Sequence, residues 1–301
     1  MKTRKGPSGL HLFDRDSGRN ILLDEIKVPK NYWDSAPRQI TIALTNECNL
    51  DCPHCYAPKK SAELQYEQVL SWLEELDKNG CLGVGFGGGE PTVYKNFPEL
   101  CSLASEKTDM AITFTTHGHN LTEALLENLS SNVHFVRISM DGVGDTYEEI
   151  RGRPFRSLLE NIRLLSKYLS FGINFLVNKK TIDELEQVTE LASELGASEV
   201  LILPEEPVRQ GSGIGPEVLK DLKKWVWNYS GTIPLSISDR YSKGFPFCDP
   251  KPEESDLQSY AHVDASGALK PTSFHCKGIK IEGSIIQSLE KLKSDYEDKE
   301  A

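Results

Sequence analysis

The sequence predicts an α/β protein built as a partial (β/α)6 TIM-like barrel, with an N-terminal β-hairpin extension and a small C-terminal α+β cap. The first observation is an alternation that starts at Arg38, in which a β-rich run is followed by a segment with apolar residues at helical spacing. The second is that this unit recurs six times, which favours a parallel sheet with right-handed crossovers, curled into an open barrel. In such folds the chemistry lies at the C-terminal ends of the strands.

The expected elements follow in a regular order, with signals at the helix ends. Ser157 and Thr181 each stand three positions before a Glu, the spacing of a capping box, while Gly80, Gly172 and Gly196 follow helical runs as stops. In chain order, the expected elements are a hairpin over 11–25, barrel strands over 39–44, 83–86, 111–115, 135–140, 172–177 and 199–203, a loop over 204–216 followed by a helix, a second hairpin over 262–271, and a last helix near 284–292.

Length and pattern divide the chain into three expected domains: an extension over 1–37, the barrel core over 38–230 and the cap over 231–301. The net charge of −11, from 34 Lys plus Arg and 45 Asp plus Glu, argues against a nucleic-acid partner, because phosphate affinity comes mainly from clustered cations. No run approaches the ~18 apolar residues of a membrane span, and no export signal is visible. Seven cysteines, an odd number, then favour reduced thiols and a cytoplasmic protein.

The strongest local signal is a run of three cysteines just past the first expected barrel strand. Cys48, Cys52 and Cys55 have the spacing C-x3-C-x2-C among loop-forming residues. Such thiolates can hold a soft metal or an iron-sulfur cluster. Structural zinc and most clusters take four protein ligands, and the fourth is missing here. His54 lies too close in sequence to its neighbours to serve easily, so we expect a cluster with one open coordination position.

This cysteine run resembles that of the radical S-adenosylmethionine (SAM) superfamily, and the likeness extends over about 39–205. The resemblance implies that Cys48, Cys52 and Cys55 bind one 4Fe-4S cluster, and that SAM chelates its fourth iron. It also implies that the backbone of Tyr56 meets the adenine of SAM.

Two further motifs at expected strand ends are similar to those of the family. The run GGGEP is like the GGEP motif, which implies that Gly88, Gly89 and Glu90 hold the amino group of SAM. The run RISMDGVGDTYEEIRG is similar to a pattern of peptide-modifying members. The residues that the resemblance assigns to SAM outside GGEP and Tyr56 are Thr116, Ser139, Asp141, Arg151 and Leu203.

Two parts of the sequence depart from the family pattern. His117 stands where relatives commonly have Asn, and it is either a substrate contact, a proton donor or a structural residue. The tail around Cys248 and Cys276 resembles a fragment of the cysteine-rich SPASM and twitch domains. Even with His275 as a third ligand an auxiliary cluster is under-supplied, so a degenerate domain without a cluster is expected.

The resemblance implies an enzyme in which the reduced cluster cleaves SAM to a 5′-deoxyadenosyl radical, which abstracts hydrogen from a substrate. The substrate is a peptide or a small metabolite, and the loop over 204–215 is the candidate contact. An electron donor such as flavodoxin or ferredoxin is implied. The alternatives are a non-catalytic scaffold that holds zinc, and an activase that places a glycyl radical on a partner protein.

Overall fold

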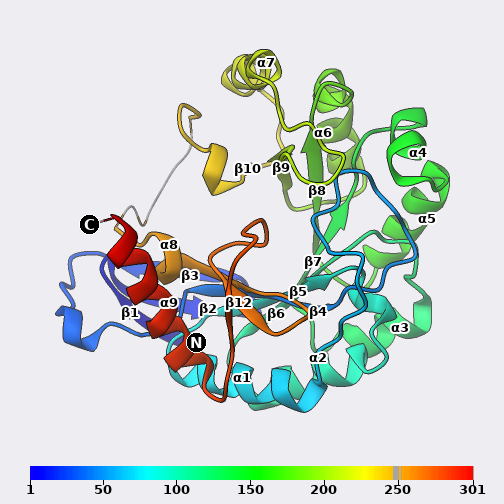
Figure 1. Cartoon of the computed structure of the whole chain (residues 1–301). Coiled ribbons are helices and arrows are strands. Elements are labelled where there is room, and N and C mark those ends of the chain that lie inside the picture. Colours follow the sequence, from blue (N-terminus) through cyan, green and yellow to red (C-terminus); the bar gives the residue numbers. More distant parts are fainter. Residues whose placement is uncertain (247–250, 252, 301) are drawn as a thin grey trace.

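The computed structural model describes residues 1–246, 251 and 253–300 and is built around one large, mostly parallel sheet (Figure 1). Within these residues its strand order is β10-β9-β8-β7-β6-β5-β4-β11-β12-β13. All neighbours from β10 to β11 are parallel, and the sheet does not close on itself. The strands are β4 (Gln39–Thr45), β5 (Gly83–Gly88), β6 (Ala111–Thr116), β7 (Phe135–Ser139), β8 (Phe171–Val177), β9 (Val200–Pro204), β10 (Leu235–Ile237), β11 (Tyr260–Val263), β12 (Ala268–Lys270) and β13 (Ile279–Lys280).

Helices cover the outer face of this sheet (Figure 1). In α5, for example, Phe155, Leu158, Ile162 and Leu165 are buried at helical spacing, so one stripe faces the core. The helices are α1 (Tyr66–Lys78), α2 (Phe97–Lys107), α3 (Glu123–Leu129), α4 (Asp145–Arg151), α5 (Phe155–Leu165), α6 (Leu185–Glu194), α7 (Pro216–Asn228), α8 (Asp256–Ser259) and α9 (Ile285–Glu300).

Over β4, β5 and β6 the inner face of the sheet is lined by small and polar residues. Side chains alternate along a strand, so Ile40 and Ile42 of β4 are buried among the helices while Thr41 faces inward. Thr41 pairs with Gly85, where an added Cβ would lie 3.2 Å from Thr41 Cγ2 and 3.4 Å from Thr113 Oγ1. The side chains of Thr41 and Thr113 therefore crowd this position, which favours a residue without a side chain.

The N-terminal extension forms a separate antiparallel sheet. Its order is β1-β2-β3, with β1 (Lys2–Gly6), β2 (Gly9–Asp14) and β3 (Arg19–Leu23). The expected hairpin over 11–25 is therefore present as β2 and β3, and β1 adds a strand that the sequence analysis missed.

The region expected to form the cap completes both edges of the large sheet. β10 pairs with β9, while β11 pairs in parallel with β4 and starts the antiparallel run β11-β12-β13. α9 packs on α1 and on β12 and β13. The second hairpin signal and the last helix are confirmed, and α9 runs longer than expected. The domain limits themselves stay a prediction.

The predicted α/β fold with a partial parallel barrel is confirmed, and the six barrel strands differ from expectation by one or two residues at their ends. The capping box at Ser157 is wrong, because α5 begins at Phe155 after Pro154. Thr181 precedes a 3-10 turn without a side-chain cap. Gly80 and Gly196 have φ of 87° and 81°, as expected for residues that end helices. The stop predicted at Gly172 is wrong, because α5 already ends at Leu165 and Gly172 lies inside β8.

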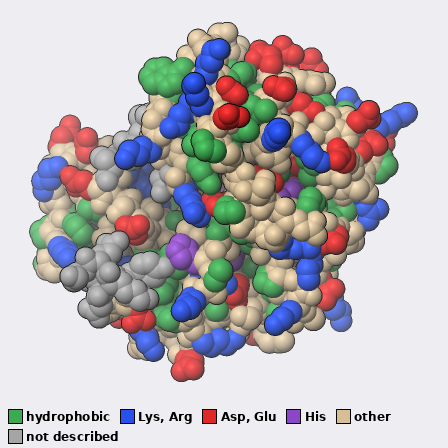
Figure 2. Space-filling model, turned by 45° about the horizontal axis from the view of Figure 1, so that its top comes forward, with side chains coloured by type: hydrophobic (Ala, Val, Ile, Leu, Met, Phe, Trp, Pro, Cys, Tyr) green, Lys and Arg blue, Asp and Glu red, His purple; other side chains and the backbone are tan. Residues whose placement is uncertain are grey.

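Two surface features bear on partners. Acidic and basic side chains are interspersed over the coloured part of the face in Figure 2, with no broad basic surface there. In the described part of the chain, no helix combines the length and apolar character needed to cross a membrane.

Candidate functional site

The three cysteines lie on a loop that leaves the C-terminal end of β4 and is fastened at its base. We call residues 46–62 the cysteine loop. Asn46 N donates to Ala62 O over 2.9 Å, and Thr45 bridges Glu63 just outside the loop. The loop therefore starts and ends at one point beside the sheet, as an Ω-loop does.

The cysteine loop carries free thiols that suit a soft metal centre. Cys52 is buried, while Cys48 and Cys55 are half-buried, and none of the three forms a disulfide. Burial raises the pKa of the Cys48 and Cys52 thiols, and the neighbouring cysteine charges add to the rise. Bound iron would remove this mutual repulsion. Among the described residues no three His, Cys, Asp or Glu side chains converge on a single-ion site. A 4Fe-4S cluster takes one thiolate per iron, so its ligands need not converge on one point.

Two glycines at the end of β5 let its backbone pack directly against the start of the cysteine loop. Gly88 has a φ of 126°, and a Cβ there would lie 2.2 Å from Thr45 O. A Cβ on Gly89 would lie 2.1 Å from Glu47 O. Gly89 N donates to Thr45 O over 2.6 Å. The structure thus gives both glycines a packing role, and their contact with SAM stays a prediction.

Replacing Gly89 by Ala is expected to lower the free energy of unfolding by about 1–3 kcal/mol, the usual cost of overpacking. The reason is that the new Cβ meets backbone, which cannot move aside as a flexible side chain does. Gly87→Ala is the matched control, because its Cβ would meet no atom closer than Tyr56 Oη at 3.9 Å. Denaturant unfolding of the iron-free protein measures both variants. Equal midpoints would contradict the packing role.

Glu90, directly after these glycines, is a buried carboxylate that accepts several hydrogen bonds. Its Oε1 accepts from Thr92 N at 3.1 Å, Thr92 Oγ1 at 2.7 Å and Thr116 Oγ1 at 2.8 Å. Its Oε2 accepts from His117 N at 2.9 Å. Burial raises its pKa, although these hydrogen bonds oppose the rise. Since Oε1 is saturated, Oε2 is the atom with acceptor capacity left for a ligand ammonium.

Asp141, two residues after β7, and Arg151, the last residue of α4, are predicted SAM contacts that form an ion pair with each other. Arg151 Nη2 pairs with Asp141 Oδ2, and His54 Nε2 lies 2.9 Å from the same oxygen. Burial alone would raise the pKa of Asp141, but Arg151 and His54 hold it at about 2. Arg151 Nη1 also donates to Cys52 Sγ over 3.5 Å. Its Nε is buried without a partner among the described residues, so one donor is left for a ligand.

Cationic side chains from three parts of the chain donate to backbone carbonyls of the cysteine loop. Arg153 Nη2 donates to Asn49 O at 3.2 Å, and Lys59 Nζ donates to Leu50 O at 3.3 Å. Arg209 Nη1, from the loop after β9, donates to Cys52 O at 3.2 Å. These charges would offset part of the negative charge of thiolates and cluster.

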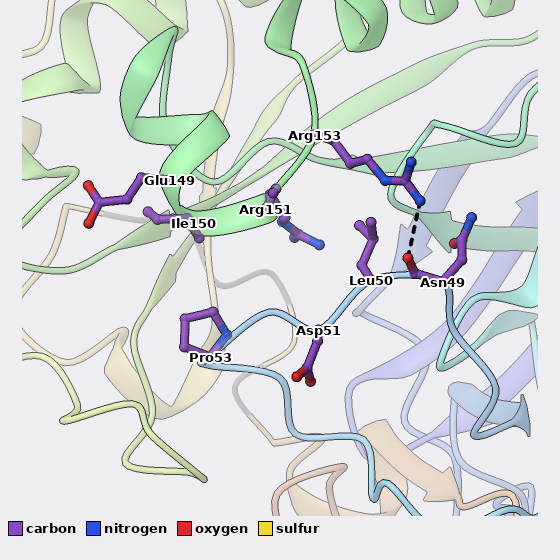
Figure 3. A pocket seen from close by; sticks show the side chains of 9 residues that line it. Asn49, Leu50, Asp51, Pro53, Glu149, Ile150, Arg151 and Arg153 are labelled. Atoms are coloured by element: carbon purple, nitrogen blue, oxygen red, sulfur yellow. Dashed lines mark hydrogen bonds between the residues drawn. The ribbon is translucent and has the colours of Figure 1, made fainter.

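A cavity of about 350 Å³ lies between the cysteine loop and the end of α4 (Figure 3). Its lining combines backbone and side chains of both segments. The lining residues are Asn49, Leu50, Asp51, Pro53, Glu149, Ile150, Arg151, Gly152 and Arg153. Gly152 has a φ of 65° and ends α4, so the chain turns there and Arg151 and Arg153 both come to the cavity.

The other predicted SAM contacts lie at separate places around the same edge of the sheet. Tyr56 is 38% exposed, and its ring lies edge-on to Phe274, with centroids 5.6 Å apart. Ser139 ends β7 and pairs with Asn174. Leu203 lies one residue before the end of β9. Their roles toward SAM stay predictions.

The residues with open roles fall into different environments. His117 is 4% exposed, and burial lowers its pKa to about 4, so it is neutral near pH 7 and is a poor proton donor. Cys276 is exposed, whereas Cys81 and Cys101 are core residues. Cys248 lies outside the described residues.

Sequence reasoning missed several polar residues that contact the motifs. Asn49 and Asn120 link the cysteine loop to the end of β6 through a 3.1 Å hydrogen bond, and Arg153 and Arg209 bind the same loop. Asn49 follows Cys48 and Arg153 lies two residues after Arg151, so their places beside motif residues could have identified them as part of the site. Nothing local in the sequence marks Asn120.

Comparison with known proteins gives one family match and several relatives. Residues 42–192 match the sequence model of the Radical SAM superfamily, which is half of the chain. Fe-coproporphyrin III synthase of Methanosarcina barkeri is 28% identical over 200 residues, which cover 64% of this chain and 45% of that protein. PqqA peptide cyclase of Granulibacter bethesdensis is 30% identical over 171 residues, covering 54% of this chain and 46% of that protein. The chain thus aligns with about half the length of these curated relatives.

Solved structures share the fold over a larger part of the chain. Streptococcus suis SuiB, in its crystal structure bound to the precursor peptide SuiA, superposes with a TM-score of 0.78 and 14% identity, covering 95% of this chain and 86% of SuiB. At this identity the likeness concerns the fold, and it agrees with the partial barrel described above.

Proposed function

Since this chain belongs to the radical SAM superfamily, we propose that it is an enzyme that binds one 4Fe-4S cluster and SAM at the cysteine loop. When bound, these groups supply the chemistry: one electron from the reduced cluster cleaves SAM to methionine and a 5′-deoxyadenosyl radical, which abstracts a hydrogen atom from the substrate. The protein's own residues bind and orient these groups.

The observation that carries this proposal is the convergence of three separate motifs on the cysteine loop. Glu90 follows directly after Gly88 and Gly89, which pack on the start of the loop. Arg151 reaches Cys52 Sγ from α4, and Asp141 holds Arg151 in place. A scaffold that only stored zinc would not need these acidic and basic partners around its thiols.

Each motif has a distinct task in this proposal. Cys48, Cys52 and Cys55 would hold three irons of the cluster. Glu90 Oε2 would accept from the SAM ammonium, and Arg151 Nε would donate to an acceptor of the bound groups. The substrate would bind at the C-terminal ends of the strands, beside the cysteine loop.

We propose a peptide as the substrate, with a small metabolite as the second candidate. PqqA peptide cyclase, a matched relative, acts on a peptide according to its name, while Fe-coproporphyrin III synthase makes a porphyrin. The loop over 204–215 remains the proposed substrate contact. Its Arg209 and Gln210 touch the cysteine loop, so substrate bound to it would lie near the cluster.

The electron is proposed to come from a small acidic protein such as a flavodoxin or ferredoxin. Lys59 of the cysteine loop and Arg153 and Arg209 beside it outnumber Asp51, which pairs with Lys59 and Arg209, so the loop region carries an excess of positive charge in a chain whose net charge is −11. Opposite charges steer association and fix orientation, so an acidic partner would meet the protein at this loop.

The proposed activity predicts that anaerobically reconstituted protein, given a reductant and SAM, slowly forms 5′-deoxyadenosine even without substrate. SAM cleavage needs only the cluster and the SAM site, so the nucleoside is expected in chromatographic analysis. Cys55→Ala serves as the control and should form none. If the parent protein carries a reducible cluster and still yields no nucleoside, the radical SAM activity is excluded and the metal-binding scaffold is favoured.

A further inference from the structure

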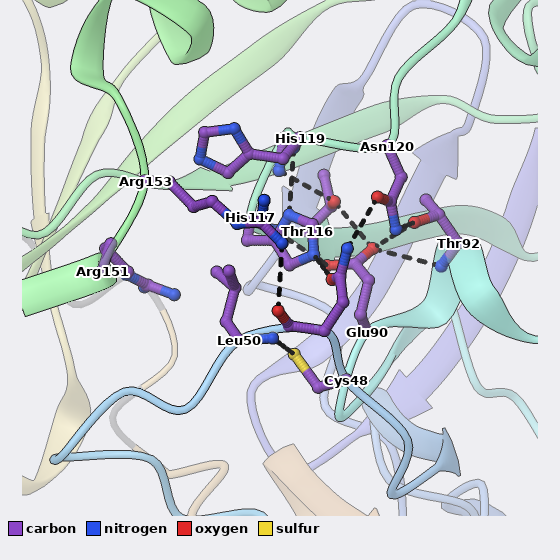
Figure 4. A network of polar contacts seen from close by, with 12 residues as sticks. Cys48, Leu50, Glu90, Thr92, Thr116, His117, His119, Asn120, Arg151 and Arg153 are labelled. Atoms are coloured by element: carbon purple, nitrogen blue, oxygen red, sulfur yellow. Dashed lines mark hydrogen bonds and ion pairs between the residues drawn. The ribbon is translucent and has the colours of Figure 1, made fainter. Parts of the chain in front are cut away.

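Five residues, Glu90 among them, form a closed ring of hydrogen bonds that joins the cysteine loop to the ends of β5 and β6 (Figure 4). The ring runs from Glu90 to Thr92, Asn120, Asn49, His117 and back to Glu90. Its links are Thr92 Oγ1 to Glu90 Oε1 at 2.7 Å, Asn120 Nδ2 to Thr92 Oγ1 at 3.1 Å, Asn49 Nδ2 to Asn120 Oδ1 at 3.1 Å, His117 Nε2 to Asn49 Oδ1 at 2.7 Å and His117 N to Glu90 Oε2 at 2.9 Å.

Every donor and acceptor in this ring can be assigned from its neighbours. His119 N donates to His117 Nδ1 over 3.0 Å, so Nδ1 is the acceptor of the neutral ring and Nε2 carries the hydrogen. Nε2 therefore donates to Asn49 Oδ1, which leaves Asn49 Nδ2 to donate to Asn120. The Thr92 hydroxyl accepts from Asn120 and donates to Glu90. Four bonds therefore run in one direction, from His117 through Asn49, Asn120 and Thr92 to Glu90, and each polarises the next. The fifth bond closes the ring from the other side, because the backbone N–H of His117 also donates to Glu90.

The ring makes Asn49 the connection between two motifs that the sequence keeps apart. Asn49 is next to Cys48, and its amide is held on both sides by residues at the end of β6. Glu90 is held by Thr92 and by the backbone of His117. A shift of the cysteine loop would break the bonds to Asn49 and free His117 and Asn120, which both lead to Glu90.

We propose that Asn49 and His117 are positioning residues that fix the cysteine loop relative to the Glu90 carboxylate. SAM affinity then depends on the side chain of Asn49, which acts through Glu90. This inference rests on the proposed function, in which Glu90 receives the SAM ammonium. His117 suits the position because its ring Nε2 lies 2.7 Å from Asn49 Oδ1 and 3.4 Å from Glu90 Oε2, while its backbone N–H donates to Glu90. The role is positioning, since neither residue acts on the reacting atoms.

The test uses Asn49→Ala, His117→Ala and the double variant, with Asn46→Ala as the matched control. Asn46 lies in the same loop, but its Nδ2 bonds only to Lys60 O, at 2.9 Å, outside the ring. SAM affinity is measured on cluster-loaded protein by titrating the change in the cluster's spin-resonance signal. Each single variant is expected to weaken SAM binding about tenfold, because the ring ends on a charged group. The double variant should be no weaker than the poorer single variant, and Asn46→Ala should match the parent.

A second measurement needs neither cluster nor SAM. Hydrogen exchange of the iron-free protein should show faster exchange of residues 46–62 in Asn49→Ala and His117→Ala than in Asn46→Ala. His117→Gln should restore part of the protection, because its amide can donate to Asn49. His117 is buried, so His117→Ala could disturb folding. Asn49→Ala tests the inference without relying on the His117→Ala variant.

The two measurements separate the inference from the proposed function. Equal exchange in Asn49→Ala and Asn46→Ala, or unchanged SAM affinity in Asn49→Ala, would overturn the positioning role. Effects that simply add in the double variant would also overturn it, because independent sites add. If the parent itself binds no SAM, the proposed function fails, and the exchange experiment still decides whether the ring holds the loop.

Discussion

Cys48→Ala, Cys52→Ala and Cys55→Ala should each abolish assembly of the cluster, whereas the parent protein should bind about four irons per chain. Each thiolate binds a different iron, so two cysteines cannot replace the third. Iron analysis after anaerobic reconstitution, together with the absorption spectrum of the cluster, measures the effect. This is a complete loss, which makes it the largest effect expected on the proposed site.

Cys276→Ala is the matched control for these variants, because Cys276 is exposed and lies apart from the cysteine loop in the sequence. Cys248→Ala should behave in the same way. Both variants are expected to keep the parent's iron content. A parent value near eight irons, reduced by either C-terminal variant, would show that the tail carries a second cluster and would overturn the prediction of a degenerate domain.

The barrel strands could be predicted because their signal is local. β4 and β8 are apolar runs bounded by loops, and burial of one or both faces leaves a pattern in the sequence. β1 has no such pattern, since its sequence is KTRKG. Its Arg4 instead pairs with Glu254 over 2.7 Å at a buried site 250 positions away. β10 and β13, of three and two residues, are too short for any periodicity and exist because a neighbouring strand edge was available.

In the candidate site, too, the features with a local sequence signal could be predicted and those set by long-range contacts could not. Glycines and a carboxylate in GGGEP indicate close backbone approach near a charge, and the structure has both. The partners of that carboxylate could not be foreseen, because Asn120 reaches the ring only through the turn after β6. Arg151 was predicted to contact SAM, and within the protein it pairs with Asp141 and also reaches Cys52 across 99 positions. Pairings at such separations depend on the tertiary fold, which no local pattern records.

Arg151→Met is expected to destabilise the iron-free protein by about 3–5 kcal/mol, because removing one member of a buried ion pair leaves the other charge uncompensated. The Asp141 side chain is 4% exposed and that of Arg151 is 11% exposed, so water cannot replace the lost partner. His54 remains 2.9 Å from Asp141 Oδ2, which places the expected loss toward the lower end of this range. Denaturant unfolding under reducing conditions gives the free energy of unfolding.

Arg156→Met provides the comparison that isolates burial. Arg156 pairs with Glu160 over 2.9 Å on α5, but the two side chains are 90% and 57% exposed, and such pairs contribute about 0.3–0.5 kcal/mol. The double variant Arg151→Met/Asp141→Asn removes both buried charges and should regain much of the stability lost in Arg151→Met. If Arg151→Met unfolds at the same denaturant concentration as Arg156→Met, the Asp141 carboxylate does not depend on Arg151, and the guanidinium is free to serve a bound ligand alone.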